Sequence, residues 1–171
     1  MNVTEAILQR RSIRKYKKGA SISDDQVKIL LTAAMAAPSA CNSRPWEYIV
    51  VRNPDKLREI RRVHSFTQML SSASLAIVVC AREDLQKGIA EGFFPQDCAA
   101  ATENILLQAV ELGLGTCWCG VYPKPKLMAA FSEKFGISEP KLPFCVIAVG
   151  VPDENPDARG YFEEAKITYI D

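Results

Sequence analysis

Apolar residues recur along much of the chain with the spacing of helices. Between Val27 and Met35 they follow the i, i+3, i+4, i+7 spacing of an amphipathic helix. Ser23 and Gln26 form a capping box just ahead of that segment. Residues 95–112 are apolar nearly all round, which predicts a helix buried on most sides. Shorter helices are expected over residues 3–11, from the Asn53-Pro54 start, and over residues 126–135.

Other apolar stretches are uninterrupted and short. Residues 75–81 and 144–151 have the content of strands that are covered on both faces. Residues 48–51 and 116–121 predict two shorter strands. Helices and buried strands therefore interleave, which predicts an α/β or α+β fold with a sheet covered on both faces. The tail has few core-forming residues and ends in the β-branched segment 166–170, which suggests an arm that reaches another subunit.

Length and composition predict one folded domain over residues 1–171, of which residues 152–171 form the C-terminal arm. The chain has 171 residues, of which 48% are hydrophobic and 24% charged, as in average globular proteins. Its apolar runs are far shorter than the ~20 residues of a membrane span. The first nine residues lack the apolar centre of a secretory signal. A cytoplasmic location is therefore expected.

Charge is balanced overall but concentrated locally. The chain has 21 basic and 20 acidic residues. Six of the basic residues fall within residues 10–18. Arg10, Arg11 and Arg14, with the hydroxyl of Ser12, would suit bidentate capture of a terminal phosphate. A solvated basic turn, or a contact with nucleic-acid phosphates, would explain the same pattern.

The cysteines and the single histidine form no recognisable metal or nucleophile motif. The six cysteines include no C-x-x-C pair, so reduced thiols packed in the core are expected. Cys117 and Cys119 would share one face of a strand, where the thiols could meet, although core packing is favoured. His64 follows a polar helix, which favours a surface position. No common catalytic motif is present, so an enzyme of this sequence would depend on a bound cofactor.

Two further segments have the composition of ligand-binding loops. Residues 38–46 place short polar side chains between two prolines, a rigid loop that would suit the polar edge of a planar heterocycle. A plain helix-to-strand connection is the alternative. Residues 113–120 are rich in small side chains, which lets backbone amides approach a ligand closely.

Taken in order, these segments resemble the FMN-dependent nitroreductase family. The resemblance covers essentially the whole chain and rests on residues 10–14 (RRSIR), 37–46 (APSACNSRPW), the helix from Asp97 into 113–116 (GLGT), 149–152 (VGVP), and Arg159 ahead of the segment 166–169. It implies an α+β fold with a mainly antiparallel central sheet. It also implies a homodimer with FMN between the subunits, in which each C-terminal arm adds a strand to the partner.

The resemblance further implies which residues hold FMN. The phosphate would be bound by Arg10, Ser12 and Arg159, with Arg11 close by, and Arg14 would lie near the pyrimidine edge of the ring. The other subunit would supply Pro38, Ser39, Ala40 and Asn42. The backbone of Cys119 and Gly120 would face flavin N5, and Gln68 would be a polar contact. No side chain is assigned as catalytic, and no metal is expected.

The activity implied is NAD(P)H-dependent reduction of nitroaromatic or quinone-type acceptors by ping-pong hydride transfer through flavin N5. A different enzyme on the same flavin scaffold, such as a dehalogenase or a flavin-fragmenting enzyme, is one alternative. A non-enzymatic module that binds flavin, phosphate or nucleic acid is another. The near-zero net charge argues against nucleic acid as the partner.

Overall fold

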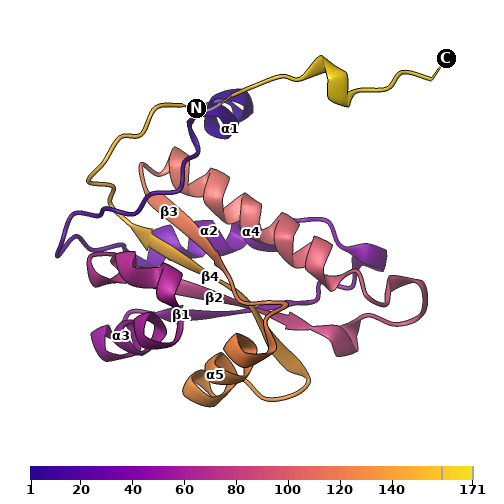
Figure 1. The fold of residues 1–171 in the computed structure, drawn as a ribbon, viewed down its shortest axis with the longest axis horizontal. Coiled ribbons are helices and arrows are strands. Elements are labelled where there is room, and N and C mark those ends of the chain that lie inside the picture. The colour runs from indigo at the N-terminus through magenta and orange to yellow at the C-terminus, as the bar shows by residue number, and fades with distance from the viewer. Residues whose placement is uncertain (159, 171) are drawn as a thin grey trace.

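A four-stranded sheet forms the centre of the molecule (Figure 1). The computed structural model describes residues 1–158 and 160–170. The strands lie in the order β1-β2-β4-β3, and the three neighbouring pairs are antiparallel. Their bounds are Trp46–Val51 (β1), Leu75–Arg82 (β2), Gly115–Gly120 (β3) and Lys141–Gly150 (β4). The predicted α+β fold with a mainly antiparallel sheet is confirmed.

Helices cover both faces of this sheet. The α-helices are Val3–Gln9 (α1), Asp24–Met35 (α2), Pro54–Val63 (α3), Phe94–Glu111 (α4) and Pro125–Phe135 (α5). Short 3-10 helices span Ala40–Asn42 (η1), Ser65–Ser71 (η2), Glu83–Leu85 (η3), Gly88–Ala90 (η4) and Glu164–Lys166 (η5). In Figure 1, α2 and α4 lie above the sheet and α3 and α5 below it.

Each face of the sheet has its own hydrophobic core, because successive strand residues point to opposite faces. In β2, Ile77 and Val79 pack with α2 and α4, whereas Ala76 and Val78 pack with α3, α5 and η2. Residues 75–81 are all buried, as the continuous apolar run predicts. The sheet is therefore held from both sides.

The strand β4 begins three residues earlier than the apolar run predicts. Pro143 lacks a backbone N–H and would normally interrupt a strand. Here it faces Cys80 across the β2–β4 pair, where the register shifts between Val79 and Cys80. The irregularity accommodates the proline, so β4 continues back to Lys141.

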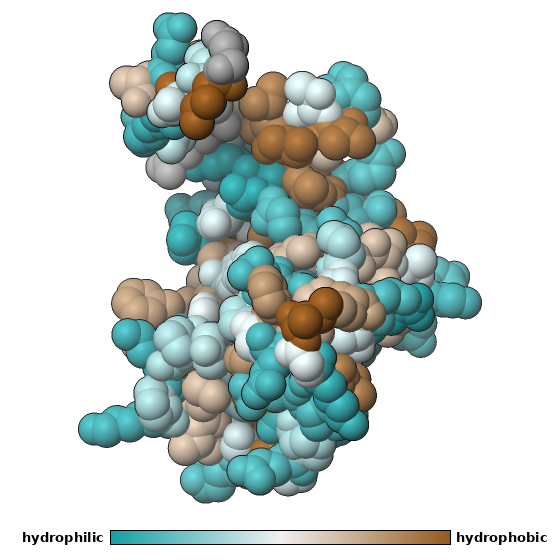
Figure 2. Space-filling model, turned by 90° about the vertical axis from the view of Figure 1, so that its right-hand side faces the viewer, coloured by the Kyte–Doolittle hydropathy of each residue, from teal (hydrophilic) through white to brown (hydrophobic). Residues whose placement is uncertain are grey.

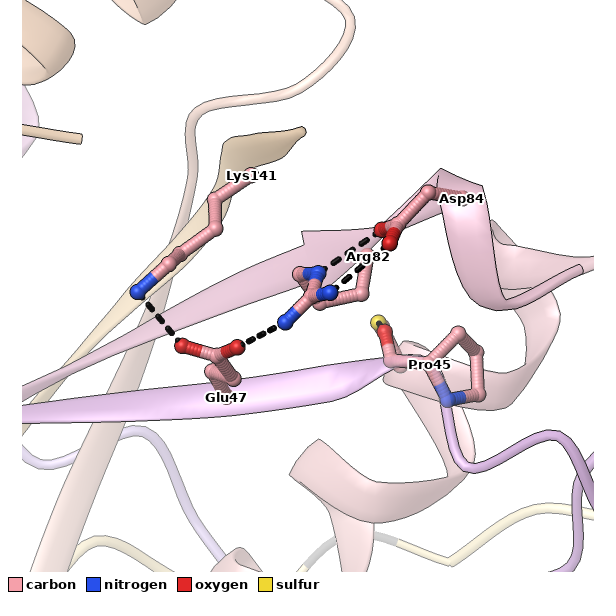
Figure 3. Close-up of polar contacts among 6 residues, drawn as sticks. Pro45, Glu47, Arg82, Asp84 and Lys141 are labelled. Carbon is pink, nitrogen blue, oxygen red and sulfur yellow. Dashed lines mark hydrogen bonds and ion pairs between the residues drawn. The ribbon is translucent and has the colours of Figure 1, made fainter. Parts of the chain in front are cut away.

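A network of charged residues ties three strands together at one end of the sheet (Figure 3). Glu47 on β1 forms ion pairs with Arg82 on β2 and with Lys141 on β4, the latter at 2.7 Å between Nζ and Oε2. Arg82 also donates from Nε and Nη2 to the carboxylate of Asp84, both at 2.7 Å. The hydrogen bonds that Glu47 accepts, from Lys141 first and then from Arg82, lower the pKa of its carboxyl group.

The tail runs away from the sheet and past α1 (Figure 1). The expected strand over residues 166–170 does not form in the single chain, where η5 occupies its start. Tyr169 and Ile170 are 76% and 93% exposed. The upper part of Figure 2, which is formed by α1 and the tail, shows separate hydrophobic patches on the surface. In the part of the chain that the structure describes, no helix combines the length and apolar character needed to cross a membrane.

Candidate functional site

The basic segment lies along the edge of β3. The N–H of Ile13 donates to the carbonyl of Thr116 at 2.8 Å, and Ser12 forms a parallel bridge with Thr116. Further along, Lys17 N–H donates to the carbonyl of Val151 at 2.9 Å. These bonds hold residues 12–17 between β3 and the chain that leaves β4. The segment predicted to bind phosphate is therefore a fixed part of the fold.

Two paired glycines allow this close approach. Gly115 and Gly150 face each other across the β3–β4 pair. A Cβ at Gly115 would lie 2.9 Å from the side chain of Ile13, and one at Gly150 would lie 2.6 Å from Cδ1 of Tyr16. Real Cβ atoms do not approach so closely, so both positions require glycine for Ile13 and Tyr16 to pack on the sheet.

The four residues Arg10, Arg11, Ser12 and Arg14 together line a small hollow of about 180 Å³. Arg10 is held by an ion pair from its Nε to Glu103 on α4, at 3.3 Å. No ion pair is formed by Arg11 or Arg14 within residues 1–158 and 160–170. Cationic guanidinium groups and a hydroxyl around a hollow form a suitable environment for a phosphate.

Arg14 also lines two further hollows. One, of about 280 Å³, is bounded by the residues of β3 from Cys117 to Gly120 and by His64 and Phe66. The other, of about 440 Å³, is bounded by η2 residues, including Gln68. Arg14 thus joins the basic hollow to the end of β3 and to η2. Seven of the residues predicted to bind flavin line these three hollows, namely Arg10, Arg11, Ser12, Arg14, Gln68, Cys119 and Gly120.

The carboxylate of Glu154 anchors the backbone at Arg14. Its Oε1 accepts the backbone N–H groups of Arg14 and Lys15, the latter at 3.1 Å. The N–H of Asp153 donates in turn to the carbonyl of Lys15 at 2.9 Å. The start of the C-terminal tail therefore fixes the basic segment. Sequence reasoning missed this residue, because its partner lies 140 positions away.

The expectation of a surface position for His64 is wrong. The residue is 5% exposed, and its Nε2 lies 2.9 Å from the carbonyl oxygen of Gly120. Its Nδ1 accepts the N–H of Phe66 at 3.3 Å, so Nε2 carries the proton and donates to Gly120. The chain bends back after α3 and buries the imidazole. His64 therefore connects η2 to the end of β3.

Gln68 lies on the rim of the η2 hollow. Its Nε2 donates to the carbonyl of Arg61 near the end of α3, at 3.0 Å. The amide oxygen keeps its capacity to accept a hydrogen bond from a ligand.

The loop after α2 does not line any of the three hollows around Arg14. Pro38, Ser39, Ala40 and Asn42 lie instead near the start of α4, where the N–H of Ala40 donates to both carboxylate oxygens of Asp97, at 3.1 and 3.2 Å. Asp97 is 6% exposed and also accepts from Gln86 at 2.8 Å. Within η1, Asn42 has a φ of 55°. One subunit alone therefore does not bring this loop to the basic segment.

Five of the six cysteines are buried, and Cys41 is exposed. All six are free thiols. In the described part of the chain, no group of three or more histidine, cysteine, aspartate or glutamate side chains is placed to hold a metal ion. Arg159, the remaining predicted phosphate ligand, lies outside the described residues.

Comparison with known proteins identifies the family. The model of the nitroreductase family matches residues 7–68 and 62–151, which include the basic segment, the loop after α2 and β3. The chain belongs to the nitroreductase family.

Relatives resemble this chain over nearly its whole length. A protein of Methanothermobacter thermautotrophicus, provisionally named NADH dehydrogenase/NAD(P)H nitroreductase, is 44% identical over 98% of this chain and 86% of its own length. The solved structure of an FMN-dependent nitroreductase from Clostridium difficile has a TM-score of 0.88 at 29% identity and covers 98% of this chain and 99% of its own. A structure from Desulfovibrio desulfuricans, provisionally named a nitroreductase and solved in complex with FMN, has a TM-score of 0.83 at 27% identity, with 100% and 97% covered.

Proposed function

We propose that this member of the nitroreductase family binds FMN and uses NAD(P)H to reduce nitroaromatic or quinone-type acceptors in a ping-pong cycle. The proposal rests on one observation above all, the position of Arg14 at the junction of three hollows. The same side chain borders the basic hollow, the end of β3 and η2. A flavin mononucleotide has a phosphate at one end and a planar polar ring at the other, and this arrangement offers complementary surfaces for both.

The basic hollow fits the phosphate. A phosphate group would meet the guanidinium groups of Arg10 and Arg11 and the hydroxyl of Ser12, which line the same hollow. Arg10 is already oriented by its ion pair with Glu103. Burial raises the pKa of Glu103, and the charge of Arg10 offsets only part of that rise. Because the ion pair uses Nε of Arg10, the two terminal nitrogens can still donate to a phosphate. We place Arg159 in the same role on the sequence pattern.

The ring would lie against the end of β3. Bound FMN supplies the redox chemistry, since its N5 position accepts a hydride and returns it. Arg14 would lie near the pyrimidine edge, where a cation stabilises negative charge on the reduced ring. The backbone of Cys119 and Gly120 would face N5, and His64 fixes that turn through its bond to the Gly120 carbonyl. Gln68 would add a polar contact from η2. These residues bind and orient the ring, and no side-chain base is required.

The second half of the site is proposed to come from a partner subunit. The loop residues Pro38, Ser39, Ala40 and Asn42 would approach the flavin of the other protomer, with Asp97 holding the loop in shape. The strand β1 pairs with β2 alone within the described residues, so its outer edge has unpaired backbone groups. The exposed tail of a partner, with its β-branched end, is suited to add a strand at this edge.

The absorption spectrum of the purified protein tests this function. We expect flavin bands that bleach on anaerobic addition of NADH or NADPH and return on addition of menadione or nitrofurazone. Protein that stays colourless after incubation with FMN would contradict the cofactor. Flavin bands that neither nicotinamide bleaches would contradict the reductant.

A truncated chain tests the role of the tail. A variant that ends at residue 158 should lose dimer in light scattering. It should also bind FMN more weakly, because it lacks Arg159 and because loss of the dimer would remove the partner's half of each site. A truncated variant that stays fully dimeric would refute arm exchange as the basis of the dimer.

A further inference from the structure

Two thiols lie side by side on β3, beside the hollow that Arg14 borders. Cys117 and Cys119 point to the same face of the strand, toward α3 and α5, and both line the hollow of about 280 Å³. Cys119 is held there by the carbonyl of Phe66, which accepts from its Sγ at 3.3 Å. Neither flavin binding nor the hydride transfer proposed above uses these side chains.

This pair differs chemically from the other buried cysteines. Burial raises the pKa of Cys80 and of Cys98 to about 12, so these thiols stay protonated and unreactive. The contact with the Cys119 side chain instead lowers the pKa of Cys117 to about 7, and the charge of Arg14 acts in the same direction. The pKa of Cys119 is raised by the same contact. Cys117 is therefore the thiol of the pair that ionises more readily.

The strand geometry disfavours a direct disulfide between them. Two residues apart on an extended strand, the Cα atoms are separated by roughly 6.6 Å. That separation is at the upper end of the ~4.4–6.8 Å that disulfides tolerate, so a direct bond would be strained. One additional atom between the two sulfurs lengthens the bridge and removes this strain. The pair is thus better suited to a shared ligand than to its own oxidation.

The number of available ligands limits which metal or metalloid centres the two cysteines could bind. Structural zinc requires four ligands. The described residues offer no group of three or more metal-binding side chains. The two cysteines therefore suit a soft metal or metalloid centre that needs only two sulfur ligands, because thiolates select soft, polarisable partners.

We propose that Cys117 and Cys119 form a two-sulfur chelating site for soft thiophilic centres, with trivalent arsenic as its representative ligand. An organoarsenous oxide, R–As=O, would condense with both thiols to form two As–S bonds. The two thiol protons and the oxygen leave as water, and the arsenic stays trivalent, so no oxidant or reductant is needed. The bound group would occupy the hollow beside Arg14.

Phenylarsine oxide is the probe for this site. A Cys41→Ser background removes the exposed thiol, and the reagent is added in one equivalent both to the flavin-containing protein and to protein freed of flavin. In the protein freed of flavin, where the hollow is open, we expect one adduct per protomer. It should have the mass of the reagent less one water and map to the peptide that carries residues 113–120. Excess 2-mercaptoethanol should leave the adduct in place, whereas dimercaptopropanol should remove it, because only a second dithiol competes with a chelate.

Single replacements identify the two ligands. In the same background, Cys117→Ser and Cys119→Ser should each lose the monothiol-resistant adduct, whereas Cys98→Ala should keep it as a matched buried control. The mass and release results on the background protein stand by themselves if a replacement fails to fold. Absence of an adduct in both flavin states, release by 2-mercaptoethanol, or retention in the Cys117 and Cys119 variants would overturn the proposal. None of these outcomes depends on whether the flavin proposal holds.

Discussion

Replacing Gly150 by alanine tests how the basic segment is seated on the sheet. The new Cβ would lie 2.6 Å from Cδ1 and 2.9 Å from Cγ of Tyr16. The ring of Tyr16 is 3% exposed, and its hydroxyl donates to the carbonyl of Ile13 at 2.7 Å. The ring therefore cannot move aside without disturbing the packing and this hydrogen bond.

The loss in free energy of unfolding on Gly150→Ala follows from those contacts. Forcing one methyl group into a well-packed core costs about 1–3 kcal/mol. Loss of the hydroxyl hydrogen bond would add ~1 kcal/mol. A destabilisation of about 2–4 kcal/mol corresponds to a fall in Tm of roughly 4–16 °C for a domain of this size. FMN should also bind more weakly, because Tyr16 and Arg14 belong to the same segment.

Urea unfolding at one protein concentration, with FMN saturating, measures this cost. A second measurement is made in a Tyr16→Ala background, where the ring is absent and the new methyl group has room. There the Gly150→Ala change should cost less than about 0.5 kcal/mol. The difference between its costs in the two backgrounds is the coupling energy, and its expected size is that of residues in contact. An equal cost in both backgrounds, or no cost in either, would refute the view that Gly150 is required by Tyr16.

Three further changes address the site and the sheet. Asp97→Ala should destabilise the protein by about 2–3 kcal/mol in urea unfolding, since the Ala40 N–H and the Gln86 amide lose their acceptor; an unchanged midpoint would exclude this role. The lowered pKa of Glu47 means that its ion pairs stabilise the fold above the ordinary glutamate pKa of 4.5, and that this stability is lost as the pH falls through the folded pKa. Glu47→Gln should therefore flatten the decline of unfolding free energy below pH 4.5, and parallel curves would argue against it. Arg10→Ala and Arg159→Ala should each weaken FMN binding by about 1.5–3 kcal/mol, or roughly 10–150-fold in Kd by fluorescence titration; unchanged Kd values in both would mean that the phosphate lies elsewhere.

The sequence predicted the elements whose signals are local. The capping box at Ser23 forms as expected, with Ser23 Oγ accepting the N–H of Gln26 at 3.1 Å. Asn53 caps α3 in the same way, and Gly136 ends α5 with a φ of 62°. Each of these signals depends on residues within a few positions of one another, so a single sequence contains them.

What the sequence could not predict depends on distant parts of the chain. The burial of His64 requires the carbonyl of Gly120, 56 positions away. The early start of β4 requires the irregular register opposite Pro143, which only the pairing with β2 reveals. The terminal segment 166–170 has the composition of a strand but pairs with no strand in the described part of its own chain.

The candidate site also has one part that forms within a single subunit and one part that does not. The structure places the basic segment against β3, because both belong to one subunit and lie on one edge of the sheet. The loop with Ala40 and Asn42 stays apart in the single chain. Its contribution to the flavin site remains a prediction.

The Kd for FMN of an Arg14→Met variant tests the central claim most directly. Methionine keeps much of the length of the side chain and removes the cation that borders all three hollows. Arg58→Met is the matched control, since Arg58 pairs with Asp55 on the exposed side of α3. We predict that Arg14→Met raises the Kd at least about tenfold, in line with the loss of a charge-assisted contact, while the control keeps the wild-type value. Equal FMN affinity in the wild type and both variants would contradict the account.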